Sequence, residues 1–213
     1  MTRISIVGGT GYAGGHIARE AVSRGHEVTS WSRHEPTEPL DGVTYRTGSL
    51  ADPDVLAEAA RADQLVVAVH GADVDGRPLS ALTPGLIDAA VAQGTRLSFV
   101  GGAGSSYVAE GGPRLVDTPD FHEEWKPEAL SHADVLAELR AAPAELQWFY
   151  VSPAALFGSY APGEATGEYR TGGDVLVTQE DGSSEISGAD FATAFVDEIE
   201  RVAHPNQRFT VGH

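Results

Sequence analysis

Residues 5–18 read SIVGGTGYAGGHIA, and this stretch decides the fold. Three of its glycines are spaced G-x-x-G-x-x-G. Residues 3–7, just before the first glycine, are apolar and rich in β-branched side chains, as in a buried strand. Residues 12–25 place apolar side chains on one helical face and end at a glycine. A strand, a glycine loop and a helix in this order are typical of a dinucleotide-binding turn.

Each of the three glycines has its own physical task in such a turn. Gly8 permits a tight turn, Gly11 lets the backbone approach a pyrophosphate, and Gly14 lets the helix and the strand pack closely. The helix N-terminus adds free N–H groups and a partial positive charge, so Ala13 in its first turn is also expected to contact the cofactor. The alternative is a glycine turn that only permits packing.

Strand-like and helix-like stretches alternate as far as Gly158. Further strands are predicted at 26–31, 42–48, 63–71, 96–102 and 146–157, and further helices at 51–62, 83–94 and 126–142. This alternation predicts an α/β fold, a Rossmann-type doubly wound parallel sheet with right-handed crossovers and helices on both faces.

The alternation stops after Gly158. Residues 167–187 look like short strands and turns, and they form a small C-terminal extension on the substrate side. Ser187 and Asp190 have the spacing of a capping box, so a last helix follows before a final strand at 208–212. No linker or repeat interrupts the sequence, which favours a single NAD(P)-binding domain over residues 1–213.

The composition is that of an acidic globular protein. The chain has 213 residues and a formal net charge of −17, which disfavours nucleic acid as a partner because such a surface repels phosphate backbones. No segment approaches the roughly 18 apolar residues that cross a membrane. There are no cysteines, and Met1-Thr2-Arg3 runs straight into a strand, which leaves no room for a signal peptide. We therefore expect a cytoplasmic protein without a nucleic-acid or membrane partner.

The end of the second predicted strand indicates which dinucleotide is bound. An NAD site usually has Asp or Glu there, accepting from the ribose 2′-OH, but this chain reads Ser30-Trp31-Ser32-Arg33. Arg33 can pair with a 2′-phosphate, helped by the hydroxyl of Ser32. The sequence therefore favours NADP(H) over NAD(H). The alternative is an Arg33 that is only solvated.

Ligands in such folds lie beyond the carboxyl ends of the strands. Gly71 and Gly102 would let the cofactor lie close to the backbone, and His70 could flank the ribose or nicotinamide, or be structural. Ser105 and Ser106 could orient a substrate carbonyl, or simply form a turn. The cofactor-binding candidates at these strand ends are Ser49, Leu50, Val69, His70, Gly71, Gly102, Ala103, Ser152, Pro153 and Ala154. The eight histidines show no metal-ligand spacing, so no metal site is predicted.

Four motifs carry a resemblance to a known family: VGGTGYAG (7–14), VGGAGS (100–105), SPAALFG (152–158) and ISGADFATAF (186–195). By these, the chain resembles the atypical short-chain dehydrogenase/reductase superfamily over nearly its whole length. It is most similar to NADH-flavin reductase-like and NmrA-like proteins, relatives of the biliverdin-IXβ/flavin reductases. The resemblance implies NADP contacts at Gly8, Thr10, Gly11, Tyr12 and Arg33, adenine-side contacts at Ser49 and Leu50, and nicotinamide-side contacts near Gly71, Gly102 and Pro153.

Two departures from the family pattern bear on the chemistry. Standard members of the superfamily use Tyr-x-x-x-Lys, where the lysine lowers the tyrosine pKa for proton transfer, but no tyrosine here has lysine four residues on. Relatives also often have Asp where Ser49 stands. Tyrosine-driven carbonyl reduction and sugar epimerisation are therefore disfavoured, and Ser105, Ser106 and Tyr107 are only weak catalytic candidates.

The leading hypothesis is an NADPH-dependent oxidoreductase that reduces a small planar acceptor such as a flavin or quinone. Orientation against the nicotinamide would then do most of the work, and solvent would supply the proton. Segments 105–126 and 156–169 are predicted to wall the acceptor site with the side chains of Tyr107, Phe121, Trp125, Phe157 and Tyr160. The alternative is a catalytically silent NADP-binding redox sensor of the NmrA-like type.

Overall fold

One eight-stranded sheet runs through the protein, with the strand order β3-β2-β1-β4-β5-β6-β8-β7. The computed structural model describes all residues, 1–213. Neighbouring strands are parallel except β7 and β8, which are antiparallel. The strands are β1 (Arg3–Val7), β2 (Glu27–Ser32), β3 (Val43–Thr47), β4 (Gln64–Val67), β5 (Arg96–Val100), β6 (Trp148–Ser152), β7 (Arg170–Gly172) and β8 (Gln207–Gly212). This arrangement confirms the predicted α/β, doubly wound fold.

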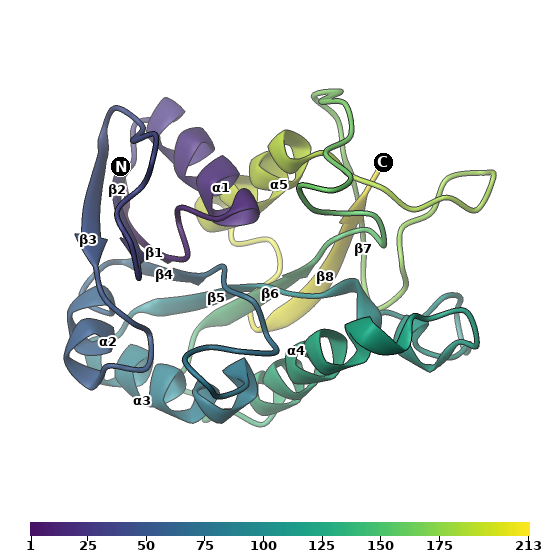
Figure 1. Cartoon of the computed structure of the whole chain (residues 1–213), viewed down its shortest axis with the longest axis horizontal. Coiled ribbons are helices and arrows are strands. Elements are labelled where there is room, and N and C mark those ends of the chain that lie inside the picture. The colour runs from purple at the N-terminus through teal and green to yellow at the C-terminus, as the bar shows by residue number, and fades with distance from the viewer.

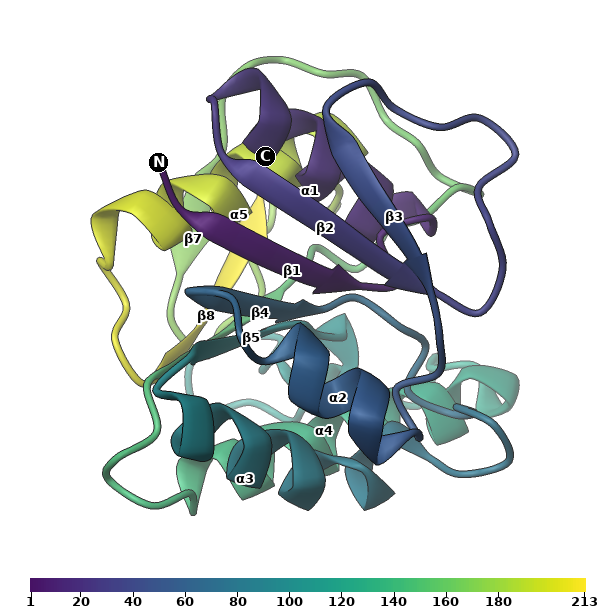
Figure 2. The ribbon, with the colours of Figure 1, turned by 90° about the vertical axis from the view of Figure 1, so that its left-hand side faces the viewer.

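Helices cover both faces of the sheet, as Figures 1 and 2 show. One face carries α1 (Tyr12–Ser23) and α5 (Gly188–Arg201), and the other carries α2 (Pro53–Ala59), α3 (Thr83–Gln93) and α4 (Lys126–Arg140). The loops hold four short 3₁₀ helices: η1 (Leu79–Ala81), η2 (Ala103–Ser105), η3 (Leu115–Asp117) and η4 (Glu123–Trp125). None of the helices combines the length and the apolar character that a bilayer crossing requires.

Each face of the sheet buries its own apolar core. Leu86 of α3 and Val135 of α4 belong to the core on one face, and Ile17 of α1 and Phe195 of α5 belong to the core on the other. Strands β4, β5 and β6 lie between these cores and are buried at every residue. Burial on both faces explains why their sequences are almost continuously apolar.

The capping residues in the sequence set several helix ends. The side chain of Asp52 accepts from the amide of Asp54 at the start of α2, and the hydroxyl of Ser187 accepts from the amide of Asp190 at the start of α5. Gly25 and Gly94 follow α1 and α3 with φ of +79° and +67°, as C-terminal glycines do. The predicted capping box at Ser187 and the predicted helix end at Gly25 are confirmed, and Asp52 and Gly94 mark ends of the predicted helices 51–62 and 83–94.

Two strands end earlier than the sequence suggests. The prediction 146–157 was too long, because β6 stops at Ser152 and only Leu156 pairs again, in an isolated bridge with Glu185. The prediction 63–71 was too long in the same way, because β4 stops at Val67. The apolar residues beyond both strands continue into loops at the carboxyl edge of the sheet.

Candidate functional site: a dinucleotide cleft

The order in which the chain adds strands to the sheet reverses between β1 and β4. The chain builds β1, β2 and β3 toward one edge and then returns to place β4 on the other side of β1. The loops that follow β1 and β4 therefore diverge, and this is the place where doubly wound sheets bind ligands.

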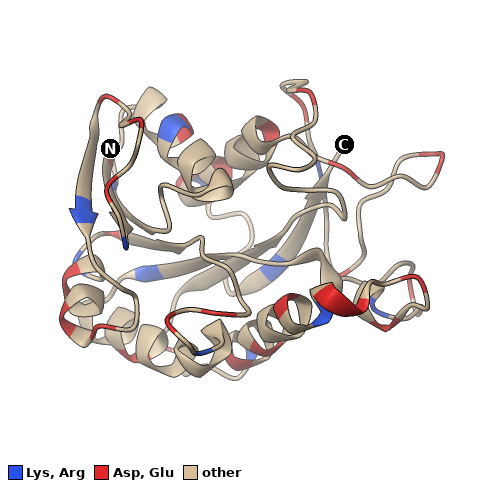
Figure 3. Ribbon diagram, in the orientation of Figure 1, with Lys and Arg blue, Asp and Glu red and all other residues tan.

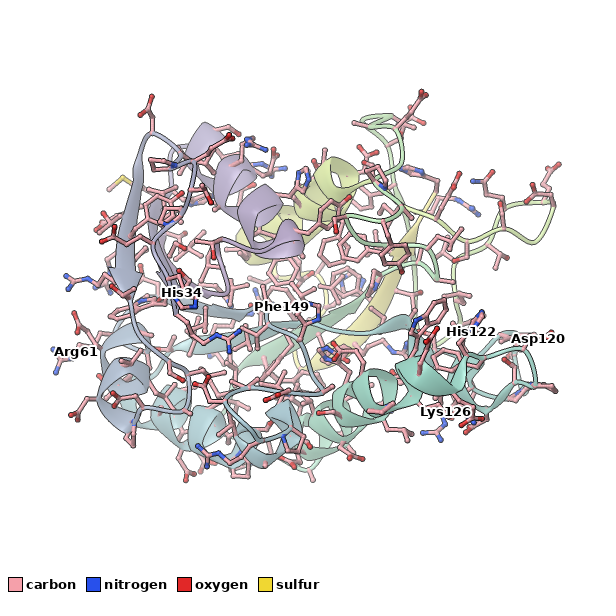
Figure 4. All side chains as sticks on the ribbon, in the orientation of Figure 1. His34, Arg61, Asp120, His122, Lys126 and Phe149 are labelled. Atoms are coloured by element: carbon pink, nitrogen blue, oxygen red, sulfur yellow. The ribbon has the colours of Figure 1, made fainter.

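A cleft of about 1590 Å³ opens at this edge of the sheet. His34 and Asp120 both line it and lie far apart in Figure 4, so the cleft extends across the molecule. Of the predicted cofactor residues, only Gly71 and Ser152 do not line it. Those that do are Gly8, Thr10, Gly11, Tyr12, Ala13, Ser32, Arg33, Ser49, Leu50, Val69, His70, Gly102, Ala103, Pro153 and Ala154.

The glycine loop owes its bare backbone to two different causes. Gly8 has a φ of +87°, and a Cβ on it would overlap the carbonyl group of Ala68. A Cβ on Gly14 would overlap the carbonyl group of Gly8. Gly11 is exposed, and the nearest atom to a Cβ there would be the carbonyl oxygen of Gly8 at 3.3 Å. Packing therefore requires the first and third glycines, whereas the second leaves open space on the cleft side.

The N-terminus of α1 presents unused hydrogen-bond donors to the cleft. Its N-cap residue, Gly11, has no side chain to cap the helix, and the amides of Tyr12 and Ala13 donate to no group of the protein. Arg19 and Arg33 are the only arginine or lysine residues that line the cleft. Free amides and the helix's partial positive charge fit a pyrophosphate. They offset locally the excess of Asp and Glu over Lys and Arg that Figure 3 marks along the chain.

Tyr12 connects the glycine loop to the far wall of the cleft. Its ring packs edge-on against Phe157, with 5.5 Å between ring centroids. Its hydroxyl donates to the carbonyl oxygen of Pro162 over 3.3 Å, and burial raises the pKa of this hydroxyl. Tyr12 thus holds the 156–162 segment against the glycine loop.

The loops beyond β2 and β3 form one end of the cleft. The guanidinium of Arg33 is 63% exposed, and its Nη1 lies 3.2 Å from Oδ1 of Asp75. The hydroxyl of Ser49 donates to the other oxygen of the same carboxylate. Ser32 does not assist Arg33 as predicted, because its hydroxyl donates to the backbone carbonyl of His34 over 2.6 Å.

Glu128, which the sequence analysis missed, anchors the loop after β4 to the first turn of α4. Its two carboxylate oxygens accept from the amides of Gly71 and Ala72, each over 2.7 Å. Nε2 of His132 and Nδ1 of His70 lie 3.2 and 3.6 Å from Oε1. Burial opposes ionisation, but the hydrogen bonds from His132, His70 and Gly71 hold the pKa of Glu128 well below its ordinary value. The same carboxylate raises the pKa of the largely exposed His70.

His132 explains one glycine that the sequence assigned to cofactor approach. A Cβ on Gly71 would lie 2.8 Å from Cδ2 of His132, so packing within the protein requires this glycine. A Cβ on Gly102 would come no closer than 3.4 Å to any atom, and Gly102 lines the cleft. Gly102 therefore leaves room for a ligand, whereas Gly71 leaves room for His132.

Ser105, Ser106 and Tyr107, the weak catalytic candidates, do not line the cleft. The buried guanidinium of Arg208 donates to the hydroxyl of Ser106 over 2.7 Å and to the carbonyl oxygen of Ser105 over 3.4 Å. The amide of Tyr107 donates to the carbonyl oxygen of Asp174 over 2.9 Å. These bonds turn the chain away from the cleft after η2. Arg208 also approaches the hydroxyl of the buried Ser152, which is why that residue too lies outside the cleft.

The opposite end of the cleft is aromatic. Phe121 and Trp125 stand edge to face with 6.3 Å between their ring centroids, and Trp125 is half exposed. Phe157 and Tyr160 line the cleft from the segment that follows β6. Asp120, His122 and Lys126 mark this end in Figure 4, at the start of α4. The structure thus places four of the five predicted wall aromatics in the cleft, and Tyr107 is the exception.

Comparison with known proteins decides the family. Residues 8–201 match the model of a family described as NAD(P)H-binding. The chain belongs to this NAD(P)H-binding family. It is also 38% identical, over 218 residues, to the uncharacterised protein YwnB of Bacillus subtilis, with 98% of this chain and 97% of that protein covered.

Two solved structures of similar proteins agree with this assignment. A Streptococcus pneumoniae protein described provisionally as an NADH-flavin reductase is 36% identical, with a TM-score of 0.86 and 100% of both chains covered. A Bacteroides thetaiotaomicron protein described provisionally as an epimerase is 30% identical, with a TM-score of 0.86, 99% of this chain and 96% of that chain covered. These relatives confirm the resemblance to the atypical short-chain dehydrogenase/reductase superfamily.

Tyr150 does not line the cleft and is not in a position to act as an acid there. Tyr150 is fully buried beneath the cleft, where its hydroxyl donates to the carbonyl oxygen of His132 and accepts from the amide of Gly102. Burial raises the pKa of Tyr150 far above its ordinary value. Tyr150 therefore supports the Gly102 loop from below.

The position of Tyr107 leads to a first prediction. We expect Tyr107→Phe to keep most of the wild-type kcat, because the hydroxyl lies outside the cleft and makes no hydrogen bond in the protein. Steady-state rates of coenzyme oxidation check this. A fall in kcat of about a thousandfold, with acceptor affinity unchanged, would instead identify Tyr107 as a proton donor, since it equals about 4 kcal/mol of transition-state stabilisation.

Proposed function

We propose that the protein is an NADPH-dependent oxidoreductase that reduces a planar acceptor such as a flavin or a quinone. One observation carries the proposal: a single cleft is lined both by the open glycine loop at the N-terminus of α1 and by four aromatic side chains of the segments 105–126 and 156–169. In this proposal residues 1–213 act as one NAD(P)-binding domain, and the protein works in the cytoplasm, where reduced nicotinamide coenzyme is supplied.

The chain's own groups provide a place for each part of the coenzyme. The free amides at the start of α1 would hold the pyrophosphate, and Arg33 would pair with the 2′-phosphate. Gly102 and Pro153 would flank the nicotinamide, because both line the cleft beyond the carboxyl ends of β5 and β6. The reduced nicotinamide of bound NADPH would supply the hydride.

The aromatic end would orient the acceptor. Trp125 and Phe121 offer an exposed face and an edge on one side, and Phe157, packed on Tyr12, offers a second surface. A flat ring stacked there presents its face toward the nicotinamide end, and orientation of this kind is worth several orders of magnitude in rate. A flavin or quinone is electron-poor, so solvent can protonate the reduced product without an acidic side chain.

The residues of this chain favour the reductase over an epimerase, because the Tyr-x-x-x-Lys pair is missing. The Streptococcus pneumoniae relative is described as a flavin reductase and the Bacteroides thetaiotaomicron relative as an epimerase, each provisionally. The standard epimerase chemistry of the superfamily relies on the Tyr-x-x-x-Lys pair, which this chain lacks. We therefore assign hydride transfer to an external acceptor.

The test is oxidation of NADPH against a panel of acceptors: FMN, riboflavin, benzoquinones and a linear tetrapyrrole. Turnover that saturates with one of these acceptors supports the reductase. Tight NADPH binding with no turnover on any of them contradicts it and supports a redox sensor instead. Protein-free mixtures measure the background reaction between NADPH and each acceptor.

A second prediction concerns Trp125. We expect Trp125→Ala to raise the KM for the acceptor by about three- to tenfold while changing kcat much less, because it removes a stacking surface and no reacting group. Tyr107→Phe is the matched control, since it alters an aromatic residue of the same segment outside the cleft. If Trp125→Ala instead weakened NADPH binding and left the acceptor KM unchanged, the aromatic end would belong to the coenzyme.

A further inference from the structure

Three side chains from three separate loops meet at the coenzyme end of the cleft. Arg33 follows β2, Ser49 follows β3, and Asp75 lies in the loop between β4 and η1. Both carboxylate oxygens of Asp75 are engaged, one with Nη1 of Arg33 at 3.2 Å and the other with the hydroxyl of Ser49. Arg33 and Ser49 line the cleft.

A tight turn fixes the position of Asp75. Val74 and Arg77 pair through backbone hydrogen bonds, and Asp73 accepts from the amide of Gly76 over 2.7 Å. Asp75 itself adopts a left-handed conformation with a φ of +53°, which is uncommon for residues other than glycine. Glu128 holds the base of the same loop through the amides of Gly71 and Ala72. The turn thus directs the carboxylate of Asp75 toward Arg33.

This arrangement conflicts with simple recognition of NADPH. The residue expected to bind the 2′-phosphate already carries a carboxylate partner, because Nη1 of Arg33 donates to Asp75. A phosphate that approached Arg33 would come close to a second negative charge, which repels it. Arg33 alone is therefore an incomplete account of coenzyme choice.

We propose that Asp75 is a specificity-determining residue that competes with the coenzyme's 2′-phosphate for Arg33. The inference rests on the NADPH preference proposed above. In the free protein the carboxylate of Asp75 pairs with the guanidinium of Arg33. When the coenzyme binds, this pair separates and the 2′-phosphate pairs with Arg33 instead. Asp75 consequently lowers the ratio of NADPH affinity to NADH affinity that Arg33 would otherwise produce.

The test compares wild type, Asp75→Asn and Asp88→Asn by titration calorimetry at low salt. Asp88 is the matched control because it is an exposed aspartate on α3, outside the cleft and without a hydrogen-bond partner. The probes are adenosine 2′,5′-bisphosphate (2′,5′-ADP) and 5′-AMP, which differ only in the 2′-phosphate and carry no nicotinamide, and NADPH and NADH are titrated beside them. Thermal unfolding of each variant checks that the fold is intact.

We expect Asp75→Asn to bind 2′,5′-ADP and NADPH about tenfold more tightly than wild type, with 5′-AMP and NADH unchanged, since the charge that repels the 2′-phosphate is removed. Asp88→Asn should match wild type. Unchanged 2′,5′-ADP affinity in Asp75→Asn overturns the inference, and so does weaker binding of NADH alone, which would make Asp75 an acceptor for a ribose hydroxyl. Failure of wild type to bind either coenzyme would instead contradict the proposed function.

Discussion

Replacing Gly11 with valine should abolish dinucleotide binding while leaving the fold intact. A Cβ at this position would lie 3.3 Å from the carbonyl oxygen of Gly8, so a shift of a few tenths of an ångström in the loop is enough for the protein to accommodate a side chain. The added methyl groups would instead fill the open space at the start of α1, where the pyrophosphate has to approach the free amides. We expect titration with NADPH to show a loss of affinity of about a hundredfold or more.

Two further glycine variants separate binding from folding. Gly173→Val is the matched control, because Gly173 is exposed, has open space around it and lies outside the cleft. Gly14→Ala should lower the melting temperature, because its Cβ would overlap the backbone of Gly8. Normal NADPH binding by a folded Gly11→Val protein would show that the glycines serve packing alone.

Arg33→Ala should weaken NADPH binding and leave NADH binding unchanged. A guanidinium paired with a phosphate contributes about 1.5–3 kcal/mol, or roughly 10- to 150-fold in affinity. Because the Arg33 side chain is 63% exposed, we expect a value near the lower limit. Titration of both coenzymes measures the effect.

Arg61→Ala is the matched control for Arg33→Ala. Arg61 is exposed in the turn after α2 and lies outside the cleft, and its side chain makes no hydrogen bond in the protein (Figure 4). Its replacement removes the same charge without touching the coenzyme end. Equal affinities of the wild-type protein for NADPH and NADH would contradict the proposed preference.

The fold could be predicted because its signals are local in the sequence. Each signal involves residues that are close together in the sequence. Examples are the glycine spacing, the apolar strands and the caps at Asp52 and Ser187, which bind amides two and three residues later. The edge of the sheet that carries the site follows from the strand order, since the carboxyl ends of parallel strands meet there. Most of the predicted cofactor residues line the cleft for this reason.

The details of the site could not be predicted, because they depend on contacts between distant residues. Glu128 reaches the amides of Gly71 and Ala72, which lie 57 and 56 residues earlier. Asp75 pairs with Arg33 across 42 residues. No periodicity or spacing in the sequence reports such pairs. Glu128 lies at the start of the predicted helix 126–142, but its position there does not show what its carboxylate holds.

The prediction that Tyr107 lines the acceptor site was wrong for the same reason. Tyr107 stands among aromatic residues in a long loop, which is why the sequence placed it in the acceptor site. Its backbone pairs with Val175 and Arg114 instead, and the buried Arg208 holds the preceding serines from β8, about a hundred residues later in the chain. The composition of the loop does not indicate that β8 will hold it away from the cleft.

A single-turnover experiment tests the central claim most directly. Protein in excess over NADPH is mixed without oxygen with riboflavin or a benzoquinone, and the loss of the reduced-nicotinamide absorbance is followed in time. The account predicts oxidation of bound NADPH much faster than in a protein-free mixture, and no acceleration by Gly11→Val. Bound NADPH that is oxidised no faster than the protein-free control by any acceptor would contradict it.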